Sequence, residues 1–170
     1  LGYLIDDVTA RAPESVLPDL KRLRDELTRV VGELRYSIFD LRREIGPGAS
    51  LTSVLADHAR HVGETAGIAV HLELAESPAR LRLAVESELL RIAQEAIANA
   101  RKHSRARNLW VTCVVDAPEV FLRVEDDGRG LSPPREDSFG LSIMRERAAR
   151  AGCTLIVAPR AGGGTSVEVR

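Results

Sequence analysis

Residues 88–104 place two polar groups on one side of an otherwise apolar helix, and this pattern limits the fold most strongly. The apolar residues recur with helical spacing at Leu89, Ile92, Ala93, Ala96, Ile97 and Ala100. Glu95 and Asn99 are four residues apart, so an α-helix puts both on one face. Lys102 and His103 follow within about one turn. The spacing predicts a helix over 86–103 that gathers a carboxylate, a carboxamide and an ammonium group.

This polar face has two interpretations. Oxygen ligands suit Mg²⁺, a carboxylate can accept a proton, and an ammonium group suits phosphate. An amphipathic helix with a solvated polar side has the same pattern. The stretch by itself leaves both open, and the motifs downstream favour the first.

The downstream motifs are rich in glycine. EDDGRG at 125–130 follows the strand-like run VFLRV, so Asp126 stands at a strand end, where its carboxylate can accept a hydrogen bond from an exocyclic amine. Gly128 and Gly130 permit close approach to the backbone, although an ordinary glycine-rich turn with acidic residues has the same sequence pattern. A helix that begins at Gly140 would offer free N–H groups to phosphate. The three glycines at 162–164 before Thr165 fit either this site or a simple hairpin turn.

The order of the elements predicts an α+β fold with two layers, a mixed sheet with helices on one face. Alternation predicts a strand at 68–74, a hairpin of 108–116 and 119–126 through Ala117-Pro118, and strands at 153–158 and 165–169. LRLAV at 81–85 reads as another short strand. Helices are expected after Ser50, which caps the first of them, and at 86–103 and 140–151. The polar segment 129–139, with two prolines, is expected to form a mobile lid.

The N-terminal region carries a heptad pattern of apolar residues, which comprises Leu20, Leu27, Val31, Leu34, Ile38, Leu41 and Ile45. It predicts either a helix of an intermolecular bundle or an amphipathic helix packed on its own domain. Gly46, Pro47 and Gly48 end this helix. The expected organisation is therefore a helical region at 1–46, a linker at 47–50 and a second domain at 51–170.

Composition excludes several classes of function. The net charge of −1 gives no field that would attract nucleic acid or membrane surfaces, and no stretch reaches the ~20 apolar residues of a membrane span. Cys113 and Cys153 stand in apolar runs and read as core residues of a cytoplasmic protein. His58 and His61 have a spacing that metal sites use, but packing or surface roles are favoured because no third ligand is evident. No GxxxxGK[ST] occurs, so a P-loop is excluded.

Taken together, QEAIANARKHS, DDGRG, FGLSIMRERAARAG and GGGTSVEV resemble the ATP-binding (Bergerat or GHKL) domain of histidine kinases, gyrase and Hsp90. The sequences of these motifs are most similar to those of bacterial sensor histidine kinases of the NarL/DesK-like branch. The resemblance covers roughly residues 50–170 and extends weakly to residue 1. It implies ATP and Mg²⁺ as ligands, a response regulator of the NarL type as partner, and a homodimer formed through the helical region in the whole protein.

The resemblance also implies roles for single residues. Those at the phosphate end are Asn99 as Mg²⁺ ligand, Glu95 as proton acceptor or orienting base, Lys102 on phosphate, and Gly140 and Leu141 at the start of the helix after the lid. Those at the adenine end are Asp126 on the amino group, Gly128 and Gly130 on the pocket wall, and Thr165 in support. His103 occupies a family-typical position in the site, and no chemical role is assigned to it.

The family's phosphoacceptor histidine precedes a segment like LGYLIDDV, in an HD-type motif. None of His58, His61, His71 and His103 stands at such a position. The acceptor is therefore expected upstream of Leu1, and the isolated chain is expected not to phosphorylate itself. Two alternatives remain, a serine kinase of the anti-sigma type and a module that binds nucleotide without turnover. Radiolabel transfer from ATP to a supplied acceptor helix distinguishes all three.

Overall fold

The computed structural model describes residues 16–20, 22, 23, 27, 45, 48–130 and 139–170. Contacts divide the chain into two units, Leu1–Arg43 and Glu44–Arg170. In the first unit, residues 17–20 and 22–23 are helical. Most of the heptad pattern and residues 131–138 of the predicted lid lie outside the described residues, so both remain predictions.

The second unit is built on a five-stranded sheet with the order β1-β2-β3-β5-β4. Its strands are β1 (Ala69–Glu76), β2 (Asn108–Asp116), β3 (Glu119–Asp126), β4 (Leu155–Pro159) and β5 (Thr165–Val169). β1 pairs with β2 in parallel, and the other neighbours are antiparallel. The parallel pair needs a crossover, which a helix between the two strands supplies. The predicted mixed sheet and the hairpin through Ala117-Pro118 are confirmed.

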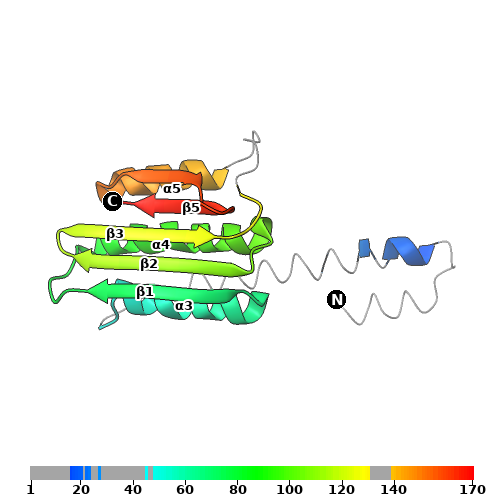
Figure 1. The fold of residues 1–170 in the computed structure, drawn as a ribbon, viewed down its shortest axis with the longest axis horizontal. Helices are drawn as coiled ribbons and strands as arrows, with labels where there is room; N and C mark the ends of the chain where they lie inside the picture. Colours follow the sequence, from blue (N-terminus) through cyan, green and yellow to red (C-terminus); the bar gives the residue numbers. More distant parts are fainter. Residues whose placement is uncertain (1–15, 21, 24–26, 28–44, 46–47, 131–138) are drawn as a thin grey trace. The chain divides into compact units, whose positions relative to one another are not determined.

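Three helices cover one face of this sheet, as Figure 1 shows: α3 (Leu51–Ala66), α4 (Leu83–Asn99) and α5 (Phe139–Ala151). The strands turn alternate residues toward these helices, among them the fully buried Leu109, Val111 and Cys113 of β2. Leu55, Ile92 and Ile97 of the helices are buried as completely. Each such leucine, isoleucine or valine contributes about 1.5–3 kcal/mol through burial. The predicted two-layer α+β architecture is confirmed.

One predicted strand is wrong. Leu83 and Val85 of LRLAV belong to the first turn of α4, because Arg82 takes the extended N-cap conformation (φ −62, ψ 135) and the helix starts directly after it. A run of five residues, four of them apolar, is too short to distinguish a strand from a helical turn by periodicity. By contrast, the predicted cap of α3 is confirmed, since the Ser50 side chain accepts a hydrogen bond from the Ser53 backbone N–H.

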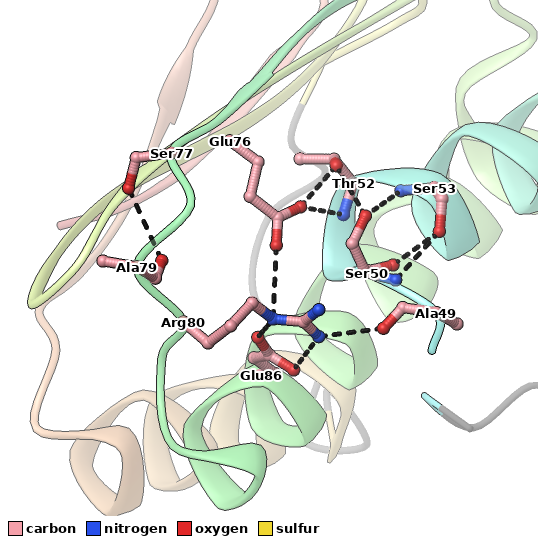
Figure 2. A network of polar contacts seen from close by, with 9 residues as sticks. All are labelled: Ala49, Ser50, Thr52, Ser53, Glu76, Ser77, Ala79, Arg80 and Glu86. Atoms are coloured by element: carbon pink, nitrogen blue, oxygen red, sulfur yellow. Dashed lines mark hydrogen bonds and ion pairs between the residues drawn. The ribbon is translucent and has the colours of Figure 1, made fainter. Parts of the chain in front are cut away.

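A polar network ties together the starts of α3 and α4 and the end of β1, and Figure 2 shows it. Glu86 is only 2% exposed, and both its carboxylate oxygens accept hydrogen bonds from Arg80, at 3.2 and 3.3 Å. Arg80 also donates to the Ala49 carbonyl at 2.8 Å. Thr52 at the start of α3 donates its hydroxyl to Glu76 on β1. A buried carboxylate is tolerated when it is paired in this way, so the network fixes how α3 and α4 begin at this end of the sheet.

Candidate functional site

The structure brings Glu95, Asn99 and Gly140 together at the point where α4 passes the start of α5. A Cβ atom added to Gly140 would lie 2.3 Å from Glu95 Oε1 and 3.8 Å from Asn99 Nδ2. Both side chains are half-buried and lie on the α4 face that meets α5. The absence of a side chain at Gly140 thus lets the first turn of α5, with its free N–H groups, approach a carboxylate and a carboxamide.

A π-helical turn, Ala100–Ser104, follows α4 and contacts the glycine-rich loop that comes after β3. The Ser104 carbonyl accepts a hydrogen bond from the Arg129 N–H at 2.8 Å. A Cβ atom on Gly128 would lie 2.3 Å from that same carbonyl oxygen, so only glycine fits without movement. The loop predicted to line the adenine site is therefore packed directly on the turn that carries Lys102.

Asp126, the last residue of β3, faces the helix layer. It has the same strand parity as the buried Leu122 and Val124, and it is itself only 6% exposed. Its Oδ1 accepts a hydrogen bond from the Gly128 N–H at 2.8 Å. Its second oxygen is the one that can serve a ligand, since no bond to it is recorded within the described part of the chain.

The start of β5 closes the site beside Asp126. Glu125 pairs with Ser166, so the antiparallel register places Asp126 opposite Thr165. Gly164 has φ +97, and a Cβ atom there would lie 1.8 Å from the Asp126 carbonyl oxygen. Gly130 has φ +77, and its Cβ position lies 3.3 Å from the Gly164 carbonyl oxygen. The glycines of the two motifs, far apart in sequence, thus pack against each other.

The remaining predicted residues have simpler placements. Lys102 is exposed on the π-helical turn, and Leu141 is half-buried in the first turn of α5. The side chain of His103 lies outside the described residues. Among the residues that the structure describes, no three His, Cys, Asp or Glu side chains form a metal-binding group. A hollow of about 620 Å³ beside Ala117 and Pro118 lies at the opposite end of β3 and contains none of the predicted site residues.

Asp127 is a structural residue of this site that the sequence did not single out. Its Oδ1 accepts hydrogen bonds from the Arg107 and Asn108 N–H groups, both at 2.8 Å, and its Oδ2 accepts from Asn108 Nδ2 at 2.8 Å. It therefore ties the loop after β3 to the start of β2. EDDGRG shows two adjacent carboxylates, but nothing local tells which one faces the site and which one anchors the loop.

The bonds of Asp127 predict a dependence of stability on acid. The hydrogen bond from the Asn108 side chain, aided by the two backbone N–H groups and opposed by partial burial, lowers the pKa of Asp127 from 3.8 to about 2. Because the pKa is lower in the folded state, the ionised Asp127 carboxylate stabilises the folded state fully above pH 3.8. This stabilisation is lost as the pH falls toward 2. Denaturant unfolding between pH 4.5 and about 2 should thus show a smaller acid loss of unfolding free energy in Asp127→Asn than in the wild type.

The control for this experiment is Asp116→Asn, at the exposed end of the same β2 strand. That variant should keep the acid dependence of the wild type. An identical dependence in Asp127→Asn and the wild type would contradict the assigned role.

Several known proteins are similar to this chain. Residues 84–170 match the family described as histidine kinase-, DNA gyrase B-, and HSP90-like ATPase. The nitrate/nitrite sensor protein NarQ of Escherichia coli is 31% identical over 88% of this chain and 33% of its own length. The signal transduction histidine-protein kinase/phosphatase DegS of Brevibacillus brevis is 28% identical over 92% of the chain and 41% of its own length. The chain thus spans about a third to two fifths of these relatives.

Solved structures share the fold. The histidine kinase domain of the Erythrobacter litoralis EL346 blue-light activated histidine kinase superposes with a TM-score of 0.63 at 19% identity, over 99% of this chain and 92% of that one. Full-length ShkA in complex with AMPPNP superposes with a TM-score of 0.55 at 22% identity, over 91% of this chain and 37% of that one. Within the described residues, no helix has the length and apolar character needed to cross a bilayer.

Proposed function

Because the chain belongs to the histidine kinase-, DNA gyrase B- and HSP90-like ATPase family, we propose that it is the catalytic ATP-binding part of a two-component sensor histidine kinase. Residues 51–170 form its catalytic domain, and residues 1–46 belong to the region through which the whole protein forms a homodimer. A response regulator of the NarL type is the partner, and the reaction takes place in the cytoplasm. The convergence of Glu95, Asn99 and Gly140 at one point carries this proposal.

The proposed reaction moves the γ-phosphoryl group of ATP to a histidine nitrogen. The bond from the γ-phosphorus to the bridging oxygen breaks, ADP leaves, and a P–N bond forms with the neutral imidazole. Glu95 accepts the proton that the attacking ring loses, or holds that ring in line. The phosphohistidine then passes its phosphoryl group to an aspartate of the response regulator.

The residues around α4 fit the ligands that this reaction needs. Mg²⁺ commonly keeps several waters and takes only one or two protein oxygens beside substrate phosphates, so the Asn99 amide oxygen is a sufficient protein ligand. The ion would neutralise charge that develops on the phosphates. Lys102 and the free N–H groups at Gly140 and Leu141 would contact the same phosphates. At the other end, Asp126 would accept a hydrogen bond from the adenine amino group, between Gly128, Gly130 and Thr165.

Labelling tests the function directly. The chain is incubated with γ-labelled ATP and Mg²⁺, alone and with a separately supplied acceptor-helix protein from a kinase of this type. We expect acid-labile phosphate on the supplied histidine and none on the chain itself. Label on a serine of an added protein would indicate the anti-sigma class instead, and nucleotide binding without any transfer would indicate a module without turnover.

Asp126→Asn should weaken ATP binding by about 1.5–3 kcal/mol, the range for a hydrogen bond to a charged group. The asparagine oxygen can keep the bond from the Gly128 N–H, so the loop should hold its shape. The other carboxylate oxygen becomes an NH₂ donor, which cannot accept from adenine. Calorimetry with ATP measures the change, with Asp116→Asn as control. Equal ATP affinities of Asp126→Asn and the wild type would refute the adenine contact.

A further inference from the structure

α4 and α5 run antiparallel and touch at two polar points that are the same number of residues apart on each helix. At one point Gly140 lies against Glu95 and Asn99. At the other, Arg147 Nη1 donates to Glu88 Oε2 at 2.7 Å. The span from 88 to 95 equals the span from 140 to 147, about two helical turns or roughly 10 Å along each axis. The ion pair and the glycine contact therefore lie at opposite ends of one helix interface.

The apolar part of this interface does little to stop the helices from sliding. Of the α5 residues, Met144, Ala148 and Ala151 are the ones buried among the described side chains. Alanine offers a smooth surface, and methionine adapts its shape to irregular gaps. Apolar contact is also non-directional, so its free energy changes little when one helix shifts slightly along the other.

The energy of the ion pair, by contrast, depends on the position of one helix along the other. The Glu88 side chain is 21% exposed and that of Arg147 is 30% exposed, so water screens the pair less than it screens a surface pair. Arg150 adds a second positive charge 3.8 Å from the other Glu88 oxygen. Two arginines one turn apart on α5 thus converge on one carboxylate of α4, and sliding either helix separates them.

We propose that Glu88 and Arg147 are positioning residues that set the register of α5 along α4. Through that register they hold the first turn of α5 at Gly140 against Glu95 and Asn99. This inference rests on the proposed function, in which the N–H groups of that turn contact the ATP phosphates. The adenine end is held by β3 and β5, which do not depend on the pair.

Charge reversal tests the register. Glu88→Arg and Arg147→Glu each place like charges together, whereas the double variant restores an attractive pair in the opposite sense. We expect each single reversal to weaken binding of ATP with Mg²⁺ to this chain by about tenfold, roughly the effect of losing one hydrogen bond from a backbone N–H group to phosphate. The double variant should recover part of that loss, because attraction between positions 88 and 147 returns while Arg150 still lies beside position 88. Calorimetry measures ATP, and titration followed by NMR measures adenosine.

Binding of adenosine distinguishes a shift of α5 along α4 from a general loss of structure. It lacks phosphates and uses the Asp126 end alone, so its affinity should remain unchanged in all three variants. Arg145→Glu, an equal change of charge at an exposed α5 position, is the control and should change neither affinity. Equal losses for ATP and adenosine, or a double variant no better than the singles, would overturn the inference.

A second readout needs no nucleotide. In the free chain, the Gly140 amide resonance should shift in each single reversal and return toward its wild-type position in the double variant. Failure of the wild type to bind ATP would refute the proposed function, while the Gly140 resonance would still decide the register. If a reversal unfolds the chain, Glu88→Gln and Arg147→Gln replace it, with smaller shifts expected, and an unmoved Gly140 resonance in both refutes the role.

Discussion

Replacing Glu95 by glutamine is expected to lower phosphotransfer to a supplied acceptor histidine by about 10²–10⁴-fold, the usual contribution of a general base. Glutamine is nearly isosteric with glutamate, so the contact between α4 and Gly140 should survive. In the proposed reaction Glu95 serves the attacking imidazole and not the nucleotide, so we expect the ATP affinity to stay within about twofold of the wild type. Single-turnover labelling measures the rate, and calorimetry measures the affinity.

The control for this experiment is Glu64→Gln, a matched change at an exposed position near the end of α3. It should alter neither the rate nor the affinity. A Glu95→Gln chain that transfers phosphate at the wild-type rate would remove Glu95 from the chemical step. A parallel loss of ATP binding would assign it to the nucleotide instead.

Gly164→Ala is expected to be the most destabilising single change in the site, with a loss of about 2–6 kcal/mol of unfolding free energy. Alanine at φ +97 would be strained, which costs about 1–3 kcal/mol. Its methyl group would also overlap the Asp126 carbonyl oxygen, which lies 1.8 Å from the Cβ position, and overpacking costs a further 1–3 kcal/mol or so. The atom it meets is backbone, so no side chain can rotate away.

Gly163→Ala is the matched control, because Gly163 has a similar φ of +102 but nothing within 4 Å of its Cβ position. It should show the backbone strain alone. Urea unfolding of both variants therefore isolates the overlap at Asp126 as the difference between them. Equal stability of the two variants would show that β5 does not pack on Asp126 as described. ATP affinity should fall in Gly164→Ala and remain near wild type in Gly163→Ala.

Much of this architecture was predictable because its signals are local in sequence. Period-two alternation predicted β2 and β3, and period 3.6 predicted α4 with Glu95 and Asn99 on one face. Ser50 predicted the start of α3 through capping chemistry. The prediction for LRLAV was wrong because a run of five residues, four of them apolar, is compatible with both periods, and the choice depended on where α4 begins. The heptad region and the lid stay predictions.

By itself, then, the sequence determined most of the elements, the two layers, and the positions of Glu95, Asn99 and Asp126 within these elements. Only the tertiary structure decided which of them meet. Arg147 contacts Glu88, 59 positions away in sequence, and Gly164 contacts Asp126 on the neighbouring strand β3. It also decided that Asp127 anchors β2 while Asp126 faces the helices. Such pairings depend on how whole elements pack in three dimensions, whereas the periodic signals in the sequence extend only over windows of about 11–18 residues.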